Sequence, residues 1–361
     1  MPLLPKKNDG TADNNGTIVE LPGVPNGGSP SASGYLVLGI GTESNNMQPA
    51  SAKVLPLDDF GDFTTTLNGA TFPGSFVDTG SNGLFFQVSK NSLPLCSDGV
   101  WYCPPAPFTN TAIQGGAASV TFTIENHDDL TNNTENNVFS DIGGTVPDTK
   151  TFDWGLPFYL GRNVYMGIEG ESPLGPYFAS GVNNGSQVSG VNVMPINVSG
   201  PVSGLVPYNN EPMVSVTVCA PGTSACQTIN GILLDTGSYG LRIFKQALNG
   251  LSLPVETSQG GELAECQPYA DGTADWGPVV TADVTLGGEP AVTVPIQVID
   301  STFQGSTNCN SGSRLDTDPS VDGYNGILGV GPFQQDCGTA CTNEKQNFSH
   351  YTQWPYWSCN N

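Results

Sequence analysis

Short runs of alternating apolar and polar residues recur along the chain, and turn-forming residues separate them. The clearest runs are GYLVLGI (34–40), SVTFTI (119–124), MVSVTVC (213–219) and VVTADVTL (279–286). A period of two is typical of strands that bury one face. The 361 residues include 46 glycines and 29 prolines, so turns are frequent. Many short strands joined by many turns predict an all-β protein.

The runs fall into two halves. We expect one lobe in residues 1–179 and a second in residues 201–361, with a linker at 180–200. The segment SGVNNGSQVSG (180–190) carries the linker prediction, because it is rich in Gly, Asn and Ser.

The two halves share an internal repeat. The first contains SFVDTGSNGLFF (75–86) and the second contains ILLDTGSYGLRIF (232–244). In each copy an apolar strand runs into Asp-Thr-Gly-Ser and is followed by Gly-Leu and a second apolar run. Two copies in matching contexts are far stronger evidence than one short motif. The repeat therefore singles out Asp78 and Asp235.

An aspartate in a tight turn at a strand end can take part in acid–base chemistry. Gly80 and Gly237 allow each turn to form and the backbone to approach closely. If two such loops meet about an approximate two-fold axis, their carboxylates lie side by side. Like charges about 3 Å apart cannot both ionise, so the pair holds one proton. One carboxylate then takes a proton from water while the other donates to a carbonyl oxygen. The alternative is structural, with each aspartate only capping its own turn.

These loops resemble those of the pepsin-like aspartic proteases, and the resemblance covers most of both halves. It implies a bilobal all-β fold, with a cleft between two related barrel-like lobes. In that family an apolar-apolar-Gly segment braces each Asp-Thr-Gly loop. The resemblance pairs Asp78 with Leu160-Gly161 in PFYLGRNVY (157–165), and Asp235 with Leu328-Gly329 in YNGILGVG (324–331).

The resemblance also assigns roles to neighbouring residues. Asp78 and Asp235 become the catalytic pair, and Gly80 and Gly237 permit their turns. The supporting side chains fall into two further pairs: Thr79 and Thr236 would cross-brace the loops, and Ser81 and Ser238 would hydrogen-bond the carboxylates from outside.

A flap over the cleft is implied by YADGTADWG (269–277). Tyr269 would close over the substrate, and Asp271 and Gly272 would form the flap tip. An ordinary strand tyrosine is the alternative for Tyr269. Arg242 stands where pepsin has a tryptophan that supports the flap tyrosine.

The order of the lobes differs from that of pepsin. The flap and YNGILGVG resemble the N-terminal lobe of the family but lie in the second half, whereas WGLPFYLGRNVY (154–165) resembles the end of the C-terminal lobe but lies in the first. The resemblance therefore implies a circular permutation. A closer resemblance is to a family of exported bacterial proteins of unknown function, in which the DTGSYGLRIF half comes first. The segments that carry it are VTVCAPGTSACQTI, LLDTGSYGLRIF, DNNGTIVELP, FGDFTTT, FVDTGSNGLFF and FDWGLPFYLGR.

Charge excludes several functions. The formal net charge is -23, with 10 Lys and Arg against 33 Asp and Glu. Nucleic-acid binding needs a basic surface, so it is excluded. No apolar run is long enough to span a membrane, and MPLLPKKNDG lacks the apolar core of a signal peptide. His127 and His350 do not form a zinc-binding set with the cysteines. We expect no metal and no cofactor.

The nine cysteines point to an oxidising compartment. Cys96 and Cys103 bracket one short loop, and Cys219 and Cys226 bracket another. Both pairs are predicted to be local disulfides, which indicates a secreted, periplasmic or cell-surface protein. One cysteine must remain unpaired within the chain, and Cys359 near the chain end is our candidate.

Together these features predict a monomeric aspartic endopeptidase that cleaves polypeptides at acidic pH. The main alternative is an exported pepsin-fold protein with weak catalysis that acts as a binding or inhibitor protein. An all-β adhesion or carbohydrate-binding protein and a glycosidase with paired carboxylates are further alternatives.

Overall fold

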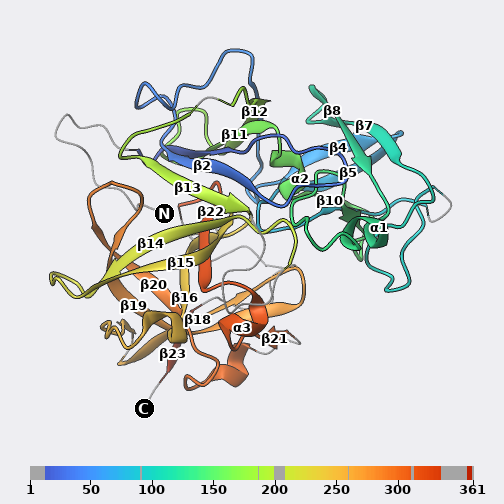
Figure 1. Cartoon of the computed structure of the whole chain (residues 1–361). Coiled ribbons are helices and arrows are strands. Elements are labelled where there is room, and N and C mark those ends of the chain that lie inside the picture. The colour runs from blue at the N-terminus through green and yellow to red at the C-terminus, as the bar shows by residue number, and fades with distance from the viewer. Residues whose placement is uncertain are drawn as a thin grey trace.

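A computed structural model describes residues 13–89, 92–185, 187–198, 208–258, 260–309 and 313–334, together with the backbone of 356–359. Strands dominate the described residues, and the helices are single turns (Figure 1). The predicted all-β class is confirmed. No helix in these ranges is long and apolar enough to cross a membrane.

The elements up to residue 198 are β1 (Gly16–Glu20), β2 (Ala32–Leu38), β3 (Lys53–Pro56), β4 (Phe63–Leu67), β5 (Ala70–Val77), β6 (Leu84–Phe86), β7 (Phe108–Gln114), β8 (Ala118–Ile124), α1 (His127–Thr131), β9 (Gly143–Gly144), β10 (Thr151–Trp154), α2 (Leu156–Tyr159), β11 (Arg162–Gly167), β12 (Tyr177–Val182) and β13 (Val193–Val198).

The later elements are β14 (Met213–Cys219), β15 (Cys226–Asp235), β16 (Tyr239–Phe244), β17 (Thr257–Ser258), β18 (Gly261–Pro268), β19 (Thr273–Thr285), β20 (Val292–Ile299), β21 (Arg314–Leu315), α3 (Pro319–Asp322), β22 (Gly326–Val330) and β23 (Tyr356–Cys359), with 3-10 turns at Lys245–Leu248 and Ser306–Cys309.

The described strands form two sheets. The smaller has the order β8-β7-β4-β5-β10-β6-β9, and the larger runs from β17 through β19, β16, β22, β15 and β14 to β13, β2, β1, β11, β12 and β3. Figure 1 shows the smaller sheet at the right and the β14–β22 part of the larger sheet at the lower left. The strands with the two Asp-Thr-Gly loops, β5 and β15, belong to different sheets.

Part of the predicted linker is strand, which corrects the expectation for residues 180–200. Strand β13 pairs with β2 along six residues, from Val193↔Val37 to Val198↔Ala32, and it also pairs with β14 through Asn197↔Met213. Met194, Ile196 and Val198 are buried in alternation with more exposed neighbours. This period-two pattern favours a strand, although Gly- and Ser-rich neighbours obscure it in the sequence.

Each Asp-Thr-Gly strand is braced by a strand that ends near a glycine. In the second half β22 lies parallel to β15, with Asp235 opposite Gly329, as predicted. In the first half the brace is β10, which pairs with β5 through Trp154↔Val77 and with β6 through Trp154↔Leu84. The glycine that follows it is Gly155, where an added Cβ would lie 2.2 Å from the Gly83 carbonyl oxygen.

The predicted brace Leu160-Gly161 is therefore wrong. These two residues lie beyond α2, where Leu160 forms an isolated bridge with Leu21. The true brace has the sequence Asp153-Trp154-Gly155, so its first position is polar. The pattern of two apolar residues followed by glycine therefore does not match this segment.

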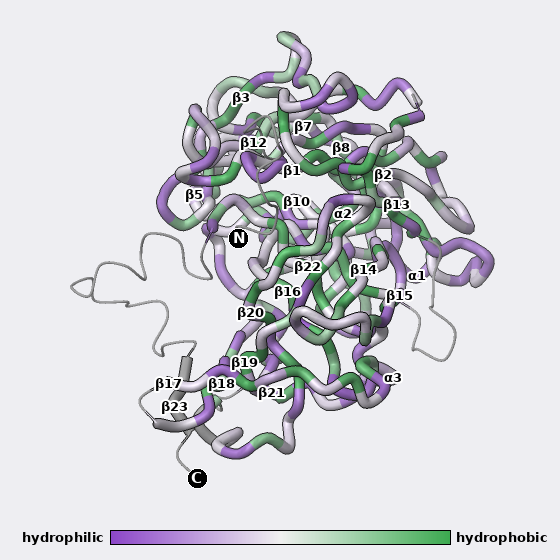
Figure 2. The backbone as a smooth tube through the Cα atoms, turned by 90° about the vertical axis from the view of Figure 1, so that its left-hand side faces the viewer, coloured by the Kyte–Doolittle hydropathy of each residue, from purple (hydrophilic) through white to green (hydrophobic). Residues whose placement is uncertain are grey.

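Buried aromatic residues fill the core beside β5 and β10. Phe152 stacks on Phe86 at 4.5 Å and on Trp154 at 4.3 Å between ring centroids. The Trp154 indole N–H donates to the Thr65 hydroxyl at 2.9 Å, so its one polar atom is satisfied. Figure 2 shows hydrophobic stretches along central strands such as β14, β16 and β22. This packing holds the strand ends that carry the two aspartates.

Disulfides are confirmed at both predicted pairs, Cys96–Cys103 and Cys219–Cys226. A third, Cys266–Cys309, was not predicted and ties β18 to the Ser306–Cys309 turn. The prediction for Cys359 concerns a side chain outside those described. Three disulfides are compatible with an extracytoplasmic protein.

Candidate active site

The two Asp-Thr-Gly turns have the same local geometry. Asp78 follows β5 and Asp235 ends β15. The Gly80 N–H donates to Asp78 Oδ1 at 2.7 Å, and the Gly237 N–H donates to Asp235 Oδ1 at 2.7 Å. Each carboxyl group therefore closes its own turn, which holds the side chain in one orientation.

The turns are locked to each other by their threonines. The Thr79 N–H donates to Thr236 Oγ1 at 3.0 Å, and the Thr236 N–H donates to Thr79 Oγ1 at 3.1 Å. The hydroxyls in turn donate across the pair to carbonyl oxygens, Thr79 to Leu234 at 2.6 Å and Thr236 to Val77 at 3.3 Å. The Tyr159 hydroxyl lies 2.7 Å from Thr236 Oγ1. The predicted cross-brace is present in the geometry.

Glycine is required where each turn faces the opposite aspartate. A Cβ added at Gly80 would lie 2.8 Å from Asp235 Oδ1, and one added at Gly237 would lie 2.7 Å from Asp78 Cγ. Real Cβ atoms do not approach other atoms that closely. The glycines therefore let the two carboxyl groups come together.

The carboxyl groups of Asp78 and Asp235 interact directly. Burial raises the pKa of Asp78 well above its usual range, and the charge of Asp235 raises it further. A hydrogen bond between the two carboxyl groups acts in the same direction, whereas the Ser81 hydroxyl lowers the pKa. Two negative charges this close repel each other, so protonation of Asp78 is favoured.

The two serines differ from the prediction that both hold a carboxylate. The Ser81 hydroxyl donates to Asp78 Oδ2 at 2.8 Å. Ser238 Oγ is buried and has no hydrogen-bond partner in the described part of the chain. The outer hydrogen bond is therefore found at Asp78 and not at Asp235, so the repeat is not symmetric in its polar contacts.

A third carboxyl group, Asp153, lies beside the pair and was not predicted. It is 6% exposed and sits on β10, one residue before Trp154. Its charge raises the pKa of Asp78, and it interacts with the Ser81 hydroxyl. The sequence offered one signal, a polar residue within the apolar brace FDWG.

The predicted flap is the hairpin of β18 and β19. Its turn is closed by the Tyr269 N–H donating to the Thr273 carbonyl at 2.9 Å, and Gly272 adopts a positive φ of 86° there. Asp271 lies exposed at the tip and accepts hydrogen bonds from Thr273. The Tyr269 hydroxyl donates to Asp275 Oδ2 at 2.7 Å. Burial raises the pKa of Tyr269 well above its usual range, and Asp275 and, more weakly, Asp235 add to this. Tyr269 is therefore close enough to Asp235 for that charge to act on it.

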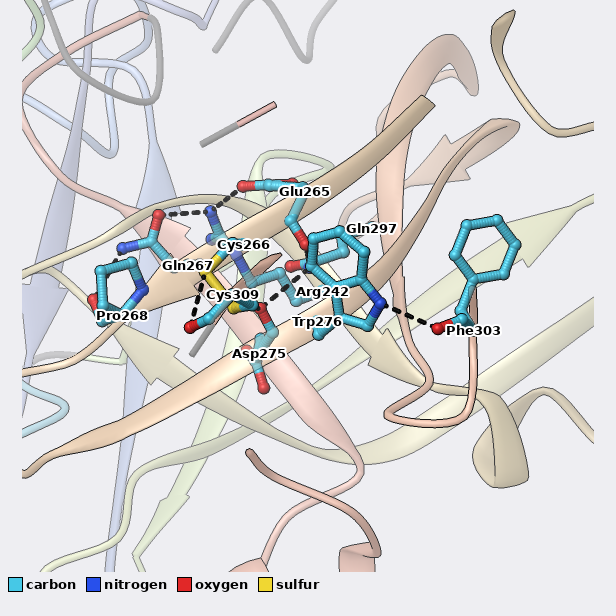
Figure 3. Close-up of a disulfide and its surroundings, with 10 residues drawn as sticks. All are labelled: Arg242, Glu265, Cys266, Gln267, Pro268, Asp275, Trp276, Gln297, Phe303 and Cys309. Carbon is cyan, nitrogen blue, oxygen red and sulfur yellow. Dashed lines mark hydrogen bonds and ion pairs between the residues drawn. A yellow bond between two sulfur atoms is a disulfide. The ribbon is translucent and has the colours of Figure 1, made fainter. Parts of the chain in front are cut away.

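Arg242 is hydrogen-bonded through its guanidinium to two side chains of β18, the first strand of the hairpin (Figure 3). Its guanidinium donates to Glu265 Oε1 at 2.7 Å and to Gln267 Oε1 at 3.2 Å, both on β18. The side chains of Arg242 and Glu265 are 2% and 6% exposed. The positive charge lowers the pKa of Tyr269 and Asp275, against the larger effect of burial. An ion pair thus occupies the place where the resemblance expects tryptophan.

Tyr208 and Glu211 lie near Asp235 and were not predicted either. Burial raises the pKa of Glu211 to about 9, against a smaller, lowering effect of the Tyr208 hydroxyl. Burial also raises the pKa of Tyr208. The next largest cause is Glu211, and Asp235 and Asp271 add smaller effects in the same direction. The charges of Asp235 and Asp271 therefore both act on Tyr208. The segment YNNEP (208–212) has the composition of a turn, so the sequence does not single out Glu211.

One group of possible metal ligands is found among the described residues, and it includes neither Asp78 nor Asp235. It consists of Cys96, His127 and Asp128. Cys96 is bonded to Cys103, so it offers no thiolate. The set therefore does not make a metal centre.

Comparison with known proteins gives a family without an activity. The family model described as "Protein of unknown function (DUF3443)" matches residues 9–180 and 188–361. No curated protein matches the sequence.

Proposed function

Because the chain belongs to this family of unknown function, we propose its activity from the site: an aspartic endopeptidase on a bilobal pepsin-like fold, with Asp78 and Asp235 as the catalytic pair. The observation that carries the proposal is the contact of two carboxyl groups from repeated Asp-Thr-Gly turns that brace each other through Thr79 and Thr236. A pair of this kind supplies one base and one acid at the same place.

The reaction needs only the pair and a water molecule. The ionised carboxylate takes a proton from water as the water oxygen bonds to the peptide carbonyl carbon. The protonated carboxyl group donates its proton to the carbonyl oxygen, which gives a tetrahedral diol. The diol collapses as the C–N bond breaks and the nitrogen takes a proton, and the pair returns to its singly protonated form. No covalent intermediate and no cofactor is needed.

The substrate we propose is an extended segment of polypeptide. In support, Tyr269 lies at the turn between β18 and β19 and feels the charge of Asp235; in this proposal the hairpin covers a bound chain. We propose that the protein acts as a monomer outside the cytoplasm. Its disulfides and its deficit of Lys and Arg support that environment.

We also propose that the two lobes stand in permuted order. The family model matches in two segments, and the break at residues 181–187 falls inside the predicted linker. A match in two pieces is expected if the halves of the family have changed places. A family member that is colinear with this chain throughout would contradict the permutation.

The test of the activity is cleavage of a denatured protein mixture between pH 3 and pH 7, with the new termini identified by mass spectrometry. The proposal expects cuts within extended segments and one atom of solvent oxygen in each new carboxyl group. A folded chain that retains peptides on a column without cutting them at any pH would favour the binding-protein alternative instead.

A further inference from the structure

Beside the pair, the buried carboxyl group of Asp153 has no counterpart in the other half of the repeat. We propose, on the basis of the proposed function, that Asp153 is a positioning residue of this site. It acts through Ser81 on Asp78. It thereby sets the pH range over which Asp78 and Asp235, the dyad, keep their shared proton.

The backbone fixes Asp153 next to the first turn. Strand β10 lies between β5 and β6, with Asp153 opposite Phe76 on one side and Phe85 on the other. The Asp78 N–H donates to the Trp154 carbonyl at 3.0 Å, and the Leu156 N–H donates to the Ser81 carbonyl at 2.8 Å. These two hydrogen bonds join the turn to the chain on either side of Trp154, so they fix the position of Asp153 relative to Ser81.

The register of the two braces identifies the residue that corresponds to Asp153. Trp154 lies opposite Val77 in one lobe, and Leu328 lies opposite Leu234 in the other. Ile327 therefore occupies the position of Asp153, and it belongs to an apolar cluster. The lobe with isoleucine has a serine without a hydrogen-bond partner among the described residues, Ser238, and the lobe with aspartate has the bonded Ser81. The half with the extra carboxyl group is thus also the half in which the serine hydrogen-bonds its aspartate.

Burying Asp153 is costly for the fold. Its Oδ1 has no hydrogen-bond partner within the described ranges, and the residue is 6% exposed. An unsatisfied buried carboxyl oxygen costs about 1–3 kcal/mol, and an apolar residue is evidently accepted at the same position of the other lobe. Violations of this kind concentrate at functional sites.

The ionisable groups that act on Asp153 come from three elements. Asp78 follows β5, Asp235 ends β15 and Tyr159 lies on α2, and each interacts electrostatically with it. Burial raises the pKa of Asp153 well above its usual range, the Ser81 hydroxyl opposes this, and Asp235 adds to it. Asp153 is therefore neutral in the acidic range.

The neutral and ionised forms act differently on the dyad. The neutral carboxyl group can donate to Ser81 Oγ, which donates to Asp78 Oδ2 and holds that oxygen in place. Once ionised, Asp153 adds a negative charge beside the pair. A further negative charge disfavours loss of the last shared proton, so the active form persists to higher pH.

The kinetic test is the pH profile of kcat/KM for the wild type, Asp153→Asn and, as matched control in the other lobe, Ile327→Val. Asparagine keeps a donor for Ser81 and removes the charge. We expect the alkaline limb to move down by about one pH unit in Asp153→Asn, which is an approximately tenfold loss on that limb, with the acidic plateau kept within about threefold. An alkaline limb that coincides with that of the wild type would overturn the proposal.

The role of Ser81 is tested by a double-mutant cycle. If Asp153 acts through Ser81, then on the alkaline limb Asp153→Asn changes kcat/KM less in a Ser81→Ala background than in the wild type, with a coupling of at least about threefold. Independent, multiplicative effects would show that Asp153 does not act through Ser81.

A measurement without turnover separates this inference from the proposed function. Carboxyl NMR of protein labelled with ¹³C at aspartate Cγ follows the titration of Asp78 whether or not the chain cleaves peptides. We expect its midpoint to shift by at least about 0.5 pH unit in Asp153→Asn. An unshifted midpoint overturns the coupling, whereas a shifted midpoint in a chain that cleaves nothing upholds the coupling and rejects the protease.

Discussion

Thr79 and Thr236 each donate a backbone N–H to the hydroxyl group of the other, at 3.0 and 3.1 Å. The two residues are 157 positions apart in sequence, and both are buried. This reciprocal pair is the direct link between the two Asp-Thr-Gly turns, so the distance between the carboxyl groups depends on it.

Removing one of these hydroxyls should cost stability. Thr236→Val keeps the shape of the side chain but leaves the Thr79 N–H and the Tyr159 hydroxyl without their partner. We expect a loss of about 1–3 kcal/mol in the free energy of unfolding, measured in urea. The control is Thr228→Val in an exposed threonine pair, which should change it by less than about 0.5 kcal/mol. Equal effects of the two substitutions would contradict the special role of the cross-brace.

Gly80→Ala tests the close approach of the turns. The new methyl group would lie 2.8 Å from Asp235 Oδ1, so the carboxyl groups must move apart. We expect a loss of about 1–3 kcal/mol in stability and a larger fall in cleavage than in stability. Gly181→Ala is the matched control, because its nearest neighbour would be Ala52 Cβ at 4.0 Å. Gly181→Ala should keep the stability and the cleavage rate of the wild type; equal losses in Gly80→Ala and Gly181→Ala would contradict the close approach.

The sequence allowed the two Asp-Thr-Gly turns, the contact between their threonines and the turn at Gly272 to be predicted, because each lies in a short local pattern. The brace of β22 was found for the same reason. The brace of β10 was missed since Asp153 interrupts its apolar pattern, and only the pairing of β10 with β5 reveals it. The hydrogen bond expected for Ser238 is absent among the described residues, and the surroundings of Tyr208 and Glu211 could not be predicted, because parts of the chain far away in sequence contribute to them.

Strand β13 and the Cys266–Cys309 disulfide illustrate the same limit. The alternation in VMPINV was visible, but the neighbouring Gly and Ser residues suggested a linker. The two cysteines of this disulfide are 43 residues apart in sequence, so it could not be predicted from a short loop between them. Long-range pairing decides both features.

Glu211 predicts how stability depends on pH. Its pKa in the folded chain is raised to about 9, from 4.5 when it is not buried. The folded state therefore holds this proton after the unfolded state has lost it, so stability falls as pH rises between those values. Its contribution to the slope is up to about 1.4 kcal/mol per pH unit.

Urea unfolding at several pH values checks this. Glu211→Gln should flatten the fall in stability between pH 5 and pH 9, whereas Glu135→Gln at an exposed site should leave it unchanged. An unaltered slope in Glu211→Gln would mean that Glu211 is ionised in the folded protein.

The buried ion pair beneath the flap should be costly to break. Arg242→Met leaves the Glu265 carboxylate buried without its guanidinium partner. We expect a loss of about 3–5 kcal/mol in the free energy of unfolding, part of which returns in Arg242→Met/Glu265→Gln. Lys245→Met is the control, because Lys245 is 63% exposed and its pair with Asp300 contributes at most about 1 kcal/mol. Similar losses for Arg242→Met and Lys245→Met would contradict the buried pair.

The most direct test of the central claim is the rate of peptide-bond cleavage by the wild type, Asp78→Asn and Asp235→Asn, at the pH where the wild type is fastest. Asparagine preserves the size of each side chain, and circular dichroism establishes that the variants are folded. We expect each single substitution to lower kcat by at least about a thousandfold, because an acid and a base are both required. If either variant keeps the rate of the wild type, Asp78 and Asp235 are not a catalytic pair.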